Sequence, residues 1–275
     1  MDVGSTRIET PLHEQRIAAV HRGEGPLGFK ESLWRSFDGY LLELAVSKGA
    51  NLINDRVSNI GWQEGRPQVV TKSGLDKTYD LLVGAVGVNS PTLDLFQGLG
   101  FGYKAPKVTK TYICEFFLGQ ETVEKYLGSS MHVFLLNIPR LEFAALIPKG
   151  DYATFCLLGD EIDQTLVNNL LQSPEVRECF PPSPSVPEAC CHCAPKIYVR
   201  EASNPFKDRV VLIGDCSVAR LYKDGIGAAY RTAKAAAVTA LFEGISEANF
   251  RDKYWPICRN ISTDNKYGQV VFTVT

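Results

Sequence analysis

The 275-residue sequence lacks the features that would indicate a membrane span, a nucleic-acid partner or export. No apolar run approaches the roughly 18–20 residues that a membrane-spanning helix needs. Lysine and arginine form no block and the formal net charge is −2, so a nucleic acid is not the expected partner. The first residues, MDVGSTRIETPLHEQ, have neither the basic start nor the apolar stretch of a signal peptide. We therefore expect a cytoplasmic protein, and peripheral contact with a membrane stays open.

Paired cysteine motifs are also missing. The eight cysteines are scattered, except for the CCHC stretch at residues 190–193 and for Cys216. A structural zinc site normally takes its ligands from two separated pairs, and no second pair exists here. A chain of this length without a signal peptide also gives no reason to expect a disulfide framework. We expect free thiols in a proline-rich loop and no bound metal.

Both ends of the chain alternate helix and strand patterns. Residues 31–49 have apolar side chains at helical spacing and end on Gly49, which predicts an amphipathic helix. Strand patterns lie around it, at residues 16–22, 50–62, 68–74 and 79–87. Towards the C-terminus, the apolar strand 208–214 leads into a helix over residues 225–242. The pattern predicts an α/β frame.

The middle of the chain differs, because strand patterns there follow one another directly. Four of them, with short turns and no helix between them, lie at residues 109–118, 131–139, 141–148 and 152–159. The second and third form a predicted hairpin. Two helices, a proline-rich excursion and a strand follow, at residues 161–172, 174–180, 181–195 and 196–200. We expect an antiparallel-sheet domain at residues 106–200, inserted between two parts of the α/β domain at 1–105 and 201–275, so that the fold class is α/β, or α+β overall.

The segment RVVLIGDCSVARLYKDGIGAAYRTAKAAAV, residues 209–238, carries the clearest functional pattern. Its apolar strand predicts burial on both faces, and ligands of open α/β sheets bind beyond the carboxyl ends of such strands. Asp215 lies at that end, where its carboxylate can accept hydrogen bonds from hydroxyl groups. Gly225 and Gly227 begin the next helix, and without Cβ atoms they let a flat or anionic group approach the helix N-terminus. These parts suit a ligand with a polyol and a planar, electron-accepting ring.

This segment resembles the second flavin fingerprint of FAD-dependent oxidoreductases of the aromatic-hydroxylase and geranylgeranyl-reductase type. In that fingerprint, an apolar strand, Gly-Asp, a short loop and Gly-x-Gly at a helix start follow one another. The resemblance implies FAD as the cofactor, with Asp215 at the ribityl chain and the helix start at the pyrimidine edge of the flavin. The residues that it makes cofactor-binding here are Gly214, Asp215, Gly225, Ile226, Gly227 and Ala228. The loop SVARLYKD departs from the family, because it lacks the common His and Pro.

Two further segments match the family in the expected order. WRSFDGYLLELAVSKGANLI is similar to a helix whose arginine contacts FAD, which makes Arg35 a candidate; an ion pair of Arg35 on a solvated helix face is equally open. YDLLVGAVGVNS is similar to the family's D-x-L-V-G-A-D-G-x-x-S segment, which brings Gly84 and Gly87 towards the pyrophosphate. Val86 stands where the family usually has Asp.

The family's N-terminal GxGxxG unit has no counterpart in this sequence. A G-x-G-x-x-G pattern at residues 23–28 is interrupted by Pro26 and is more typical of a surface loop. We therefore expect a fragment of a longer protein. A chain that kept the fold as a non-catalytic interaction module is the alternative.

The resemblance implies an enzyme in which reduced flavin either passes a hydride to a carbon–carbon double bond or activates oxygen for hydroxylation. The variant LYKDGIGAAYRTAKAAA looks closer to the geranylgeranyl reductases. The sequence therefore favours reduction of C=C bonds in an apolar, isoprenoid-like or lipid substrate, with NAD(P)H or ferredoxin as the electron donor. A flavin monooxygenase is the alternative, and the apolar central strands fit either a lipid-binding wall or plain core.

Three residues of the loop before the helix are candidates for contact with the substrate. By the resemblance, Arg220, Tyr222 and Lys223 pass near the reactive ring, where they would bind substrate or protonate product. A solvated loop with charges explains them nearly as well. Two other residues, His132 and Cys216, are better interpreted as buried structural side chains.

Overall fold

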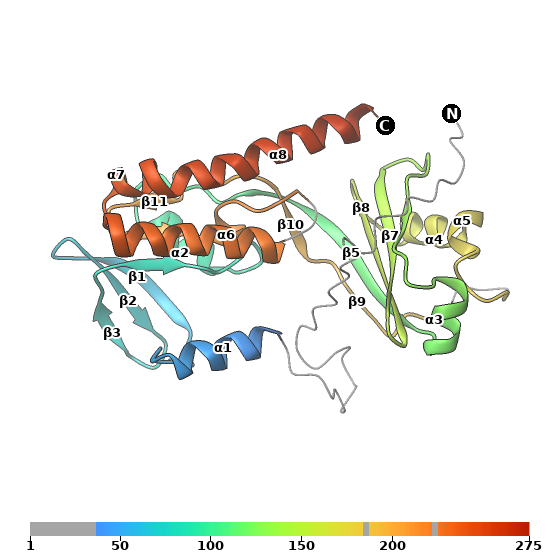
Figure 1. The fold of residues 1–275 in the computed structure, drawn as a ribbon, viewed down its shortest axis with the longest axis horizontal. Coiled ribbons are helices and arrows are strands. Elements are labelled where there is room, and N and C mark those ends of the chain that lie inside the picture. Colours follow the sequence, from blue (N-terminus) through green and yellow to red (C-terminus); the bar gives the residue numbers. More distant parts are fainter. Residues whose placement is uncertain (1–36, 184–186, 222–224, 275) are drawn as a thin grey trace.

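The computed structural model describes residues 37–183, 187–221 and 225–274 (Figure 1). Several sequence predictions lie outside these residues: those for Arg35, Tyr222 and Lys223, the strand at 16–22 and the glycine pattern at 23–28. No helix in the described ranges is both long enough and apolar enough to cross a membrane.

Helices and strands are mixed along the described chain. The helices are α1 Phe37–Ser47, α2 Thr92–Gly98, α3 Gln120–Tyr126, α4 Gln164–Gln172, α5 Pro174–Arg177, α6 Gly225–Val238, α7 Glu247–Asn249 and α8 Trp255–Val274, with shorter or wider helical turns at η1 Gly214–Cys216, η2 Thr239–Glu243 and η3 Phe250–Tyr254. The strands are β1 Val57–Gln63, β2 Arg66–Thr71, β3 Asp76–Thr78, β4 Leu82–Gly84, β5 Lys107–Phe117, β6 His132–Phe134, β7 Leu141–Lys149, β8 Tyr152–Gly159, β9 Cys191–Cys193, β10 Lys196–Arg200, β11 Phe206–Lys207 and β12 Val210–Leu212. This mixture confirms the predicted α/β class.

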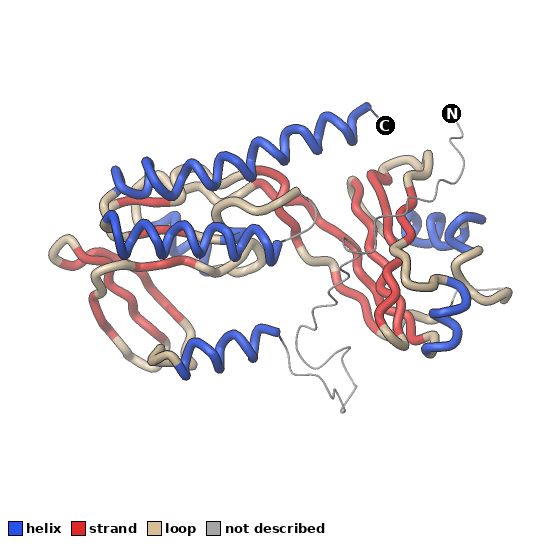
Figure 2. The backbone as a smooth tube through the Cα atoms, in the orientation of Figure 1, coloured by secondary structure: helices blue, strands red, loops and turns tan. Residues whose placement is uncertain are grey.

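A three-stranded sheet, in the order β11-β12-β4, forms the centre of one half of the molecule. Strand β12 pairs parallel with β4, so that Val210 faces Leu82 and Leu212 faces Gly84. Successive side chains of β12 point to opposite faces. Val211 packs in a core with α6, η3 and α8, whereas Val210 and Leu212 pack in a second core with α2. The sheet is therefore covered on both faces, as its continuous apolar sequence predicts (Figure 2).

An antiparallel meander, β1-β2-β3, packs beside this sheet. A turn at Glu64 and Gly65, with φ angles of 50° and 74°, joins β1 to β2. The Trp62 indole N–H donates to the Leu99 carbonyl at 3.2 Å, which ties the meander to the end of α2.

The second half is a six-stranded antiparallel sheet, in the order β10-β5-β8-β7-β6 with β9 also paired to β5. Figure 1 shows β5 and β10 leading from the first half into this sheet. The hairpin expected from residues 131–148 is confirmed, because β6 pairs antiparallel with β7. Two expectations were wrong: α3 interrupts the predicted run of strands, and part of the proline-rich excursion is strand β9, which completes hydrogen bonds along the edge of β5.

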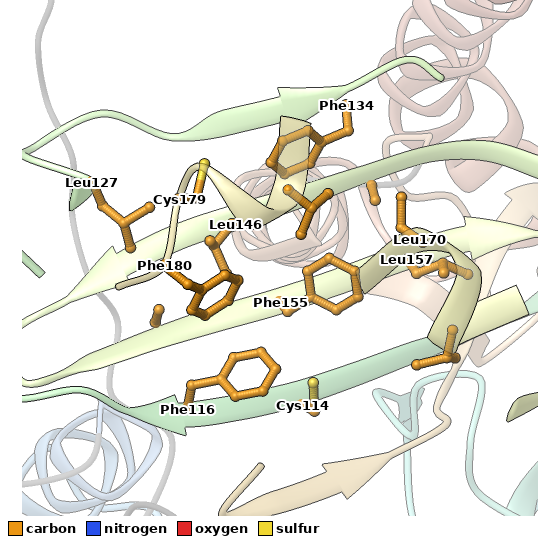
Figure 3. Packing of buried hydrophobic residues seen from close by; sticks show 14 of the residues in the cluster. Cys114, Phe116, Leu127, Phe134, Leu146, Phe155, Leu157, Leu170, Cys179 and Phe180 are labelled. Atoms are coloured by element: carbon orange, nitrogen blue, oxygen red, sulfur yellow. The ribbon is translucent and has the colours of Figure 1, made fainter. Parts of the chain in front are cut away.

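Helices α3, α4 and α5 cover one face of the six-stranded sheet and enclose its core (Figures 1 and 3). Phe116 on β5 meets Phe180 edge to face, with ring centroids 5.2 Å apart, and Phe155 and Leu157 of β8 are fully buried beside them. These apolar side chains of β5 and β8 therefore form core, whereas Phe117 on β5 and Met131, Val133 and Leu135 in and around β6 are exposed. Removing one such buried ring would cost about 3–5 kcal/mol.

Helix α1 buries none of its 11 residues. It ends as predicted: Gly49, at φ +97°, follows its last turn, and its N–H donates to the Val46 carbonyl at 2.9 Å.

Candidate functional site at the ends of two parallel strands

Strands β4 and β12 end side by side, and the two glycine-containing segments of interest continue from those ends. Leu212 lies opposite Gly84, and the Ile213 N–H donates to the Gly84 carbonyl at 2.9 Å. Segments 84–87 and 214–216, about 130 residues apart in the sequence, thus lie at one edge of the sheet. The carboxyl end of parallel strands is where open α/β sheets bind ligands.

The Asp215 carboxylate lies against the first residue of α6. A Cβ atom built on Gly225 would stand 3.5 Å from one carboxylate oxygen of Asp215 and 3.9 Å from the other. The absence of that Cβ leaves the acid beside the start of a 14-residue helix. A negative charge is favoured there, because the helix dipole is positive at its N-terminus.

The turn that carries Asp215 is fastened to α6 through a buried threonine. Gly214 has a φ of +63°, a conformation that side-chain-bearing residues rarely adopt. Its N–H donates to Thr232 Oγ1 at 2.9 Å, and the Thr232 hydroxyl donates to the Ala228 carbonyl at 2.9 Å. The distance between Asp215 and the helix start is therefore held by the Thr232 hydroxyl on the buried side of the turn.

Cys216 holds the ends of the two strands together from inside. Its thiol lies 3.0 Å from the Ile213 carbonyl and 3.2 Å from the Gly84 carbonyl, and its own carbonyl accepts the Tyr103 hydroxyl at 2.7 Å. Burial raises the pKa of this thiol, although the N–H groups of Val86 and Gly87 oppose the shift. The side chain is completely buried, so Cys216 has a structural position and offers no accessible nucleophile.

The two glycines after β4 are required for different reasons. A Cβ on Gly84 would lie 2.8 Å from a ring carbon of Phe96 and 3.1 Å from Leu212, so Gly84 allows close packing in the core. Gly87 has a φ of +66° and nothing within 4 Å of its missing Cβ. Of the pair, Gly87 is the one that offers open backbone to a ligand.

The start of α6 is similarly divided between open and buried positions. Ile226 is exposed and Gly227 is half-buried, whereas Ala228 is fully buried in the core beneath the helix. Of the predicted set, Gly87, Asp215, Gly225 and Ile226 lie at the open edge, Gly227 is half-buried beside them, and Gly84, Gly214 and Ala228 pack behind that edge.

Helix α8 holds the loop that follows Asp215, a contribution that the sequence analysis missed. Asn265, which is buried, donates its side-chain N–H to the Ala219 carbonyl and accepts the Leu221 N–H, both at 2.8 Å. Earlier in the chain, the buried Tyr254 hydroxyl donates to the Leu212 carbonyl at 2.6 Å and lies 3.0 Å from Ser217 Oγ. In the sequence, the one signal for this contact was Asn265 itself, a polar residue among the apolar positions of a C-terminal helix.

Arg220, a candidate for substrate contact, also reaches α8. One of its guanidinium nitrogens lies 3.3 Å from an Asp264 carboxylate oxygen, and about a third of its side chain is exposed. In this structure the Arg220 guanidinium therefore pairs with a carboxylate on α8 and is not an unpaired charge of a solvated loop.

Comparison with known proteins finds a shared fold and no closer relationship. No family model and no curated protein matches the sequence. Among solved structures, tetracycline destructase Tet(51) matches 87% of this chain and 67% of its own, at 17% identity and a TM-score of 0.56. The flavin-dependent halogenase BrvH from Brevundimonas sp. BAL3 matches 84% of this chain and 44% of its own, at 15% identity and a TM-score of 0.57.

A mutant of the halogenase PltM, solved in complex with FAD, gives a TM-score of 0.61 at 15% identity over 86% of this chain and 52% of its own. The chain therefore spans between 44% and 67% of the length of these three proteins. At such identities the likeness shows that this chain shares the fold of these three proteins.

Proposed function

We propose that this chain forms the flavin-holding part of an FAD-dependent oxidoreductase. One observation carries the proposal: the Asp215 carboxylate lies 3.5 Å from the position that a Cβ of Gly225 would occupy, at a helix start beside the ends of two parallel strands. The shared fold with halogenase and destructase structures, one of them containing FAD, supports it.

The open-edge residues fit the parts of such a cofactor. The Asp215 carboxylate would accept hydrogen bonds from the ribityl hydroxyls, and the N–H groups of Gly225 and Gly227 would meet the pyrimidine edge. The open backbone of Gly87 would approach the pyrophosphate. Gly84, Gly214 and Ala228 would act by packing behind these groups. The bound flavin would supply two-electron redox chemistry, and the protein would position it and exclude water.

The outer face of the six-stranded sheet bears on the choice of substrate. Side chains alternate along β5, so Glu115 lies on the face opposite the core residues Cys114 and Phe116. Glu115 accepts hydrogen bonds from Lys149 Nζ at 3.1 Å and from Thr154 at 3.2 Å. A partly buried carboxylate with these partners suits a substrate with polar groups better than a hydrocarbon chain.

Two reactions are therefore proposed for the whole protein, in order of support. Oxygen-dependent oxidation of a polar small molecule is favoured by the Glu115–Lys149 pair on the outer face and by the fold shared with a halogenase and a tetracycline destructase. Reduction of an isoprenoid-like C=C bond is favoured by the sequence variant of the fingerprint alone. Incorporation of oxygen-18 from the gas into product would support the first, and anaerobic saturation of a polyprenyl double bond would support the second.

The flavin proposal is tested by titrating the purified chain with FAD, desalting it and recording absorbance from about 300 to 550 nm, a range that covers the flavin bands. We expect Asp215→Asn to weaken FAD binding by about tenfold or more, because charge-assisted hydrogen bonds are lost, without unfolding the chain. Asp252→Asn, which alters an exposed acid on η3, is the matched control and should bind like the unmodified chain. Normal binding in Asp215→Asn would refute the role of Asp215, and absence of saturable binding in the unmodified chain would refute the proposal.

A further inference from the structure

A surface pocket of about 390 Å³ lies along β11, the outer strand of the three-stranded sheet, and the flavin proposal does not use it. Its walls come from β11 and the residues before it, from the segment after α2, and from α7, η3 and α8. None of the open-edge residues, Gly87, Asp215, Gly225 and Ile226, lines this pocket. Its volume is in the range of small-ligand sites.

The pocket carries an excess of positive charge. Its lining includes Lys207, Arg251 and Arg259 against a single carboxylate, that of Glu247. Glu247 binds two of these cations: Lys207 Nζ lies 2.5 Å from one of its oxygens, and Arg251 pairs with the other. Behind it, the Asp208 carboxylate accepts the Glu247 N–H at 2.7 Å but does not line the pocket.

The third cation is available to a ligand. Within the described ranges, Arg259 has no hydrogen-bond or ion-pair partner, and it is exposed. Hydrogen bonding to Glu247 raises the pKa of Lys207, so that this ammonium stays charged at neutral pH. Two guanidinium groups and one ammonium thus surround the same space. Because the lining contains a single carboxylate, two of these three positive charges are not neutralised within the pocket.

Aromatic rings stand next to this charge. Trp255 begins α8, four residues after Arg251 of η3 and one turn before Arg259, and all three side chains line the pocket. The Trp255 ring packs on Phe206, with centroids 5.8 Å apart and a tilt of 59°, which fixes its orientation. Phe101 lines the pocket from the segment after α2. A planar ring can stack on such surfaces while its substituent reaches the cations.

We propose that this pocket binds a phosphate monoester carried on a planar ring, the chemistry of a nucleoside monophosphate. A phosphate monoester carries about −1.5 to −2 charges at pH 7, which matches the excess in the lining, whereas a carboxylate carries one. Arginine forks bind phosphate oxygens in pairs, and Trp255 with Phe101 supplies the ring surface.

Isothermal titration calorimetry with adenosine 5′-monophosphate, adenosine and inorganic phosphate, each alone, tests the proposal on the full chain. The monophosphate should bind saturably and at least about tenfold more tightly than either part, because ring and phosphate contacts add. Inorganic phosphate binding as tightly as the monophosphate would overturn the role of the rings. Absence of saturable binding of the monophosphate would overturn the site.

Arg259→Gln is the informative variant, because Arg259 is exposed and its loss removes no hydrogen bond or ion pair within the described structure. This variant should weaken binding of the monophosphate by about tenfold or more, because charge-assisted contacts are lost. Lys253→Gln removes a nearby cation that pairs with Glu243 at 3.5 Å and does not line the pocket, so it should bind like the unmodified chain. Equal weakening in both variants would overturn the site in favour of general charge attraction. FAD binding, measured on the same variants, should be unchanged, which separates this test from that of the flavin proposal.

Discussion

Replacing Thr232 with valine tests how the turn that carries Asp215 is held. Thr232 is fully buried on α6, where its hydroxyl oxygen accepts the Gly214 N–H at 2.9 Å. Valine has the same branched shape and a similar helix propensity. The substitution therefore removes the acceptor without leaving a cavity and leaves the N–H of Gly214 buried and unpaired.

The size of the effect follows from that unpaired donor. A buried donor without a partner costs about 1–3 kcal/mol. The Gly214 N–H cannot easily reorient towards another acceptor, because Gly214 is held at a φ of +63° between β12 and α6. The other lost contact, from the threonine hydroxyl to the Ala228 carbonyl, is a back-bond within the helix and contributes little. We expect the free energy of unfolding to fall by about 2 kcal/mol.

Thr239→Val is the matched control for this measurement. Thr239 is also buried and lies seven residues further along, but its hydroxyl only donates to the Ala235 carbonyl at 2.9 Å; no N–H of the described chain donates to it. We expect its loss to change the free energy of unfolding by less than about 1 kcal/mol. Urea denaturation gives both values, and amide exchange at Gly214 should accelerate only in Thr232→Val. Equal losses in the two variants would refute the reasoning.

Three further perturbations follow from the same structure. Gly225→Ala should leave the melting temperature unchanged or raise it, since the new Cβ makes only ordinary van der Waals contact. It should nevertheless weaken FAD binding by about tenfold or more, because the methyl group fills space beside the Asp215 carboxylate. Equilibrium dialysis measures this change in affinity. Asn265→Ala should cost about 2 kcal/mol by leaving two backbone groups unpaired, whereas Asn260→Ala on the exposed side of α8 should cost little in urea denaturation. The side-chain hydrogen bond from Arg140 lowers the pKa of Asp163 from 3.8 to about 2, so the stability it contributes should be present above about pH 4 and be lost towards pH 2. Asp163→Asn should show a smaller decline of the melting temperature over that pH range.

Elements whose pattern is local were predictable from the sequence. Strand β12 and helix α6 follow from an apolar run, Gly-Asp and an alanine-rich segment, and the hairpin of β6 and β7 follows from two strand patterns with a short turn. Helix α3 was missed because it is seven residues long and lies between two strong strand patterns. Strand β9 was missed because its cysteines become a strand only through pairing with β5, some 75 residues earlier in the chain.

The candidate site shows the same division between local and distant causes. Spacing placed Asp215 near a glycine at a helix start, and the structure brings the two together. Spacing did not distinguish Gly87 from Gly84, because the difference lies in Phe96, a side chain of another element that fills the space beside Gly84. The burial of Ala228 likewise depends on residues of β12 and α8 that pack against it.

The motif alone does not determine the geometry of the site. Its loop is fixed at two points by α8 and the turn before it: Tyr254 bonds the Leu212 carbonyl at the end of β12, and Asn265 bonds both Ala219 and Leu221. Both side chains are buried, so each bond forms away from competing water and is costly to leave unmade. Asn265, 44 positions after Leu221 in the sequence, must therefore fold back onto the loop before the acid and the helix start are held at their observed separation. Any segment with the same Gly-Asp and Gly-x-Gly spacing but no such helix behind it would present the same groups without holding them in place.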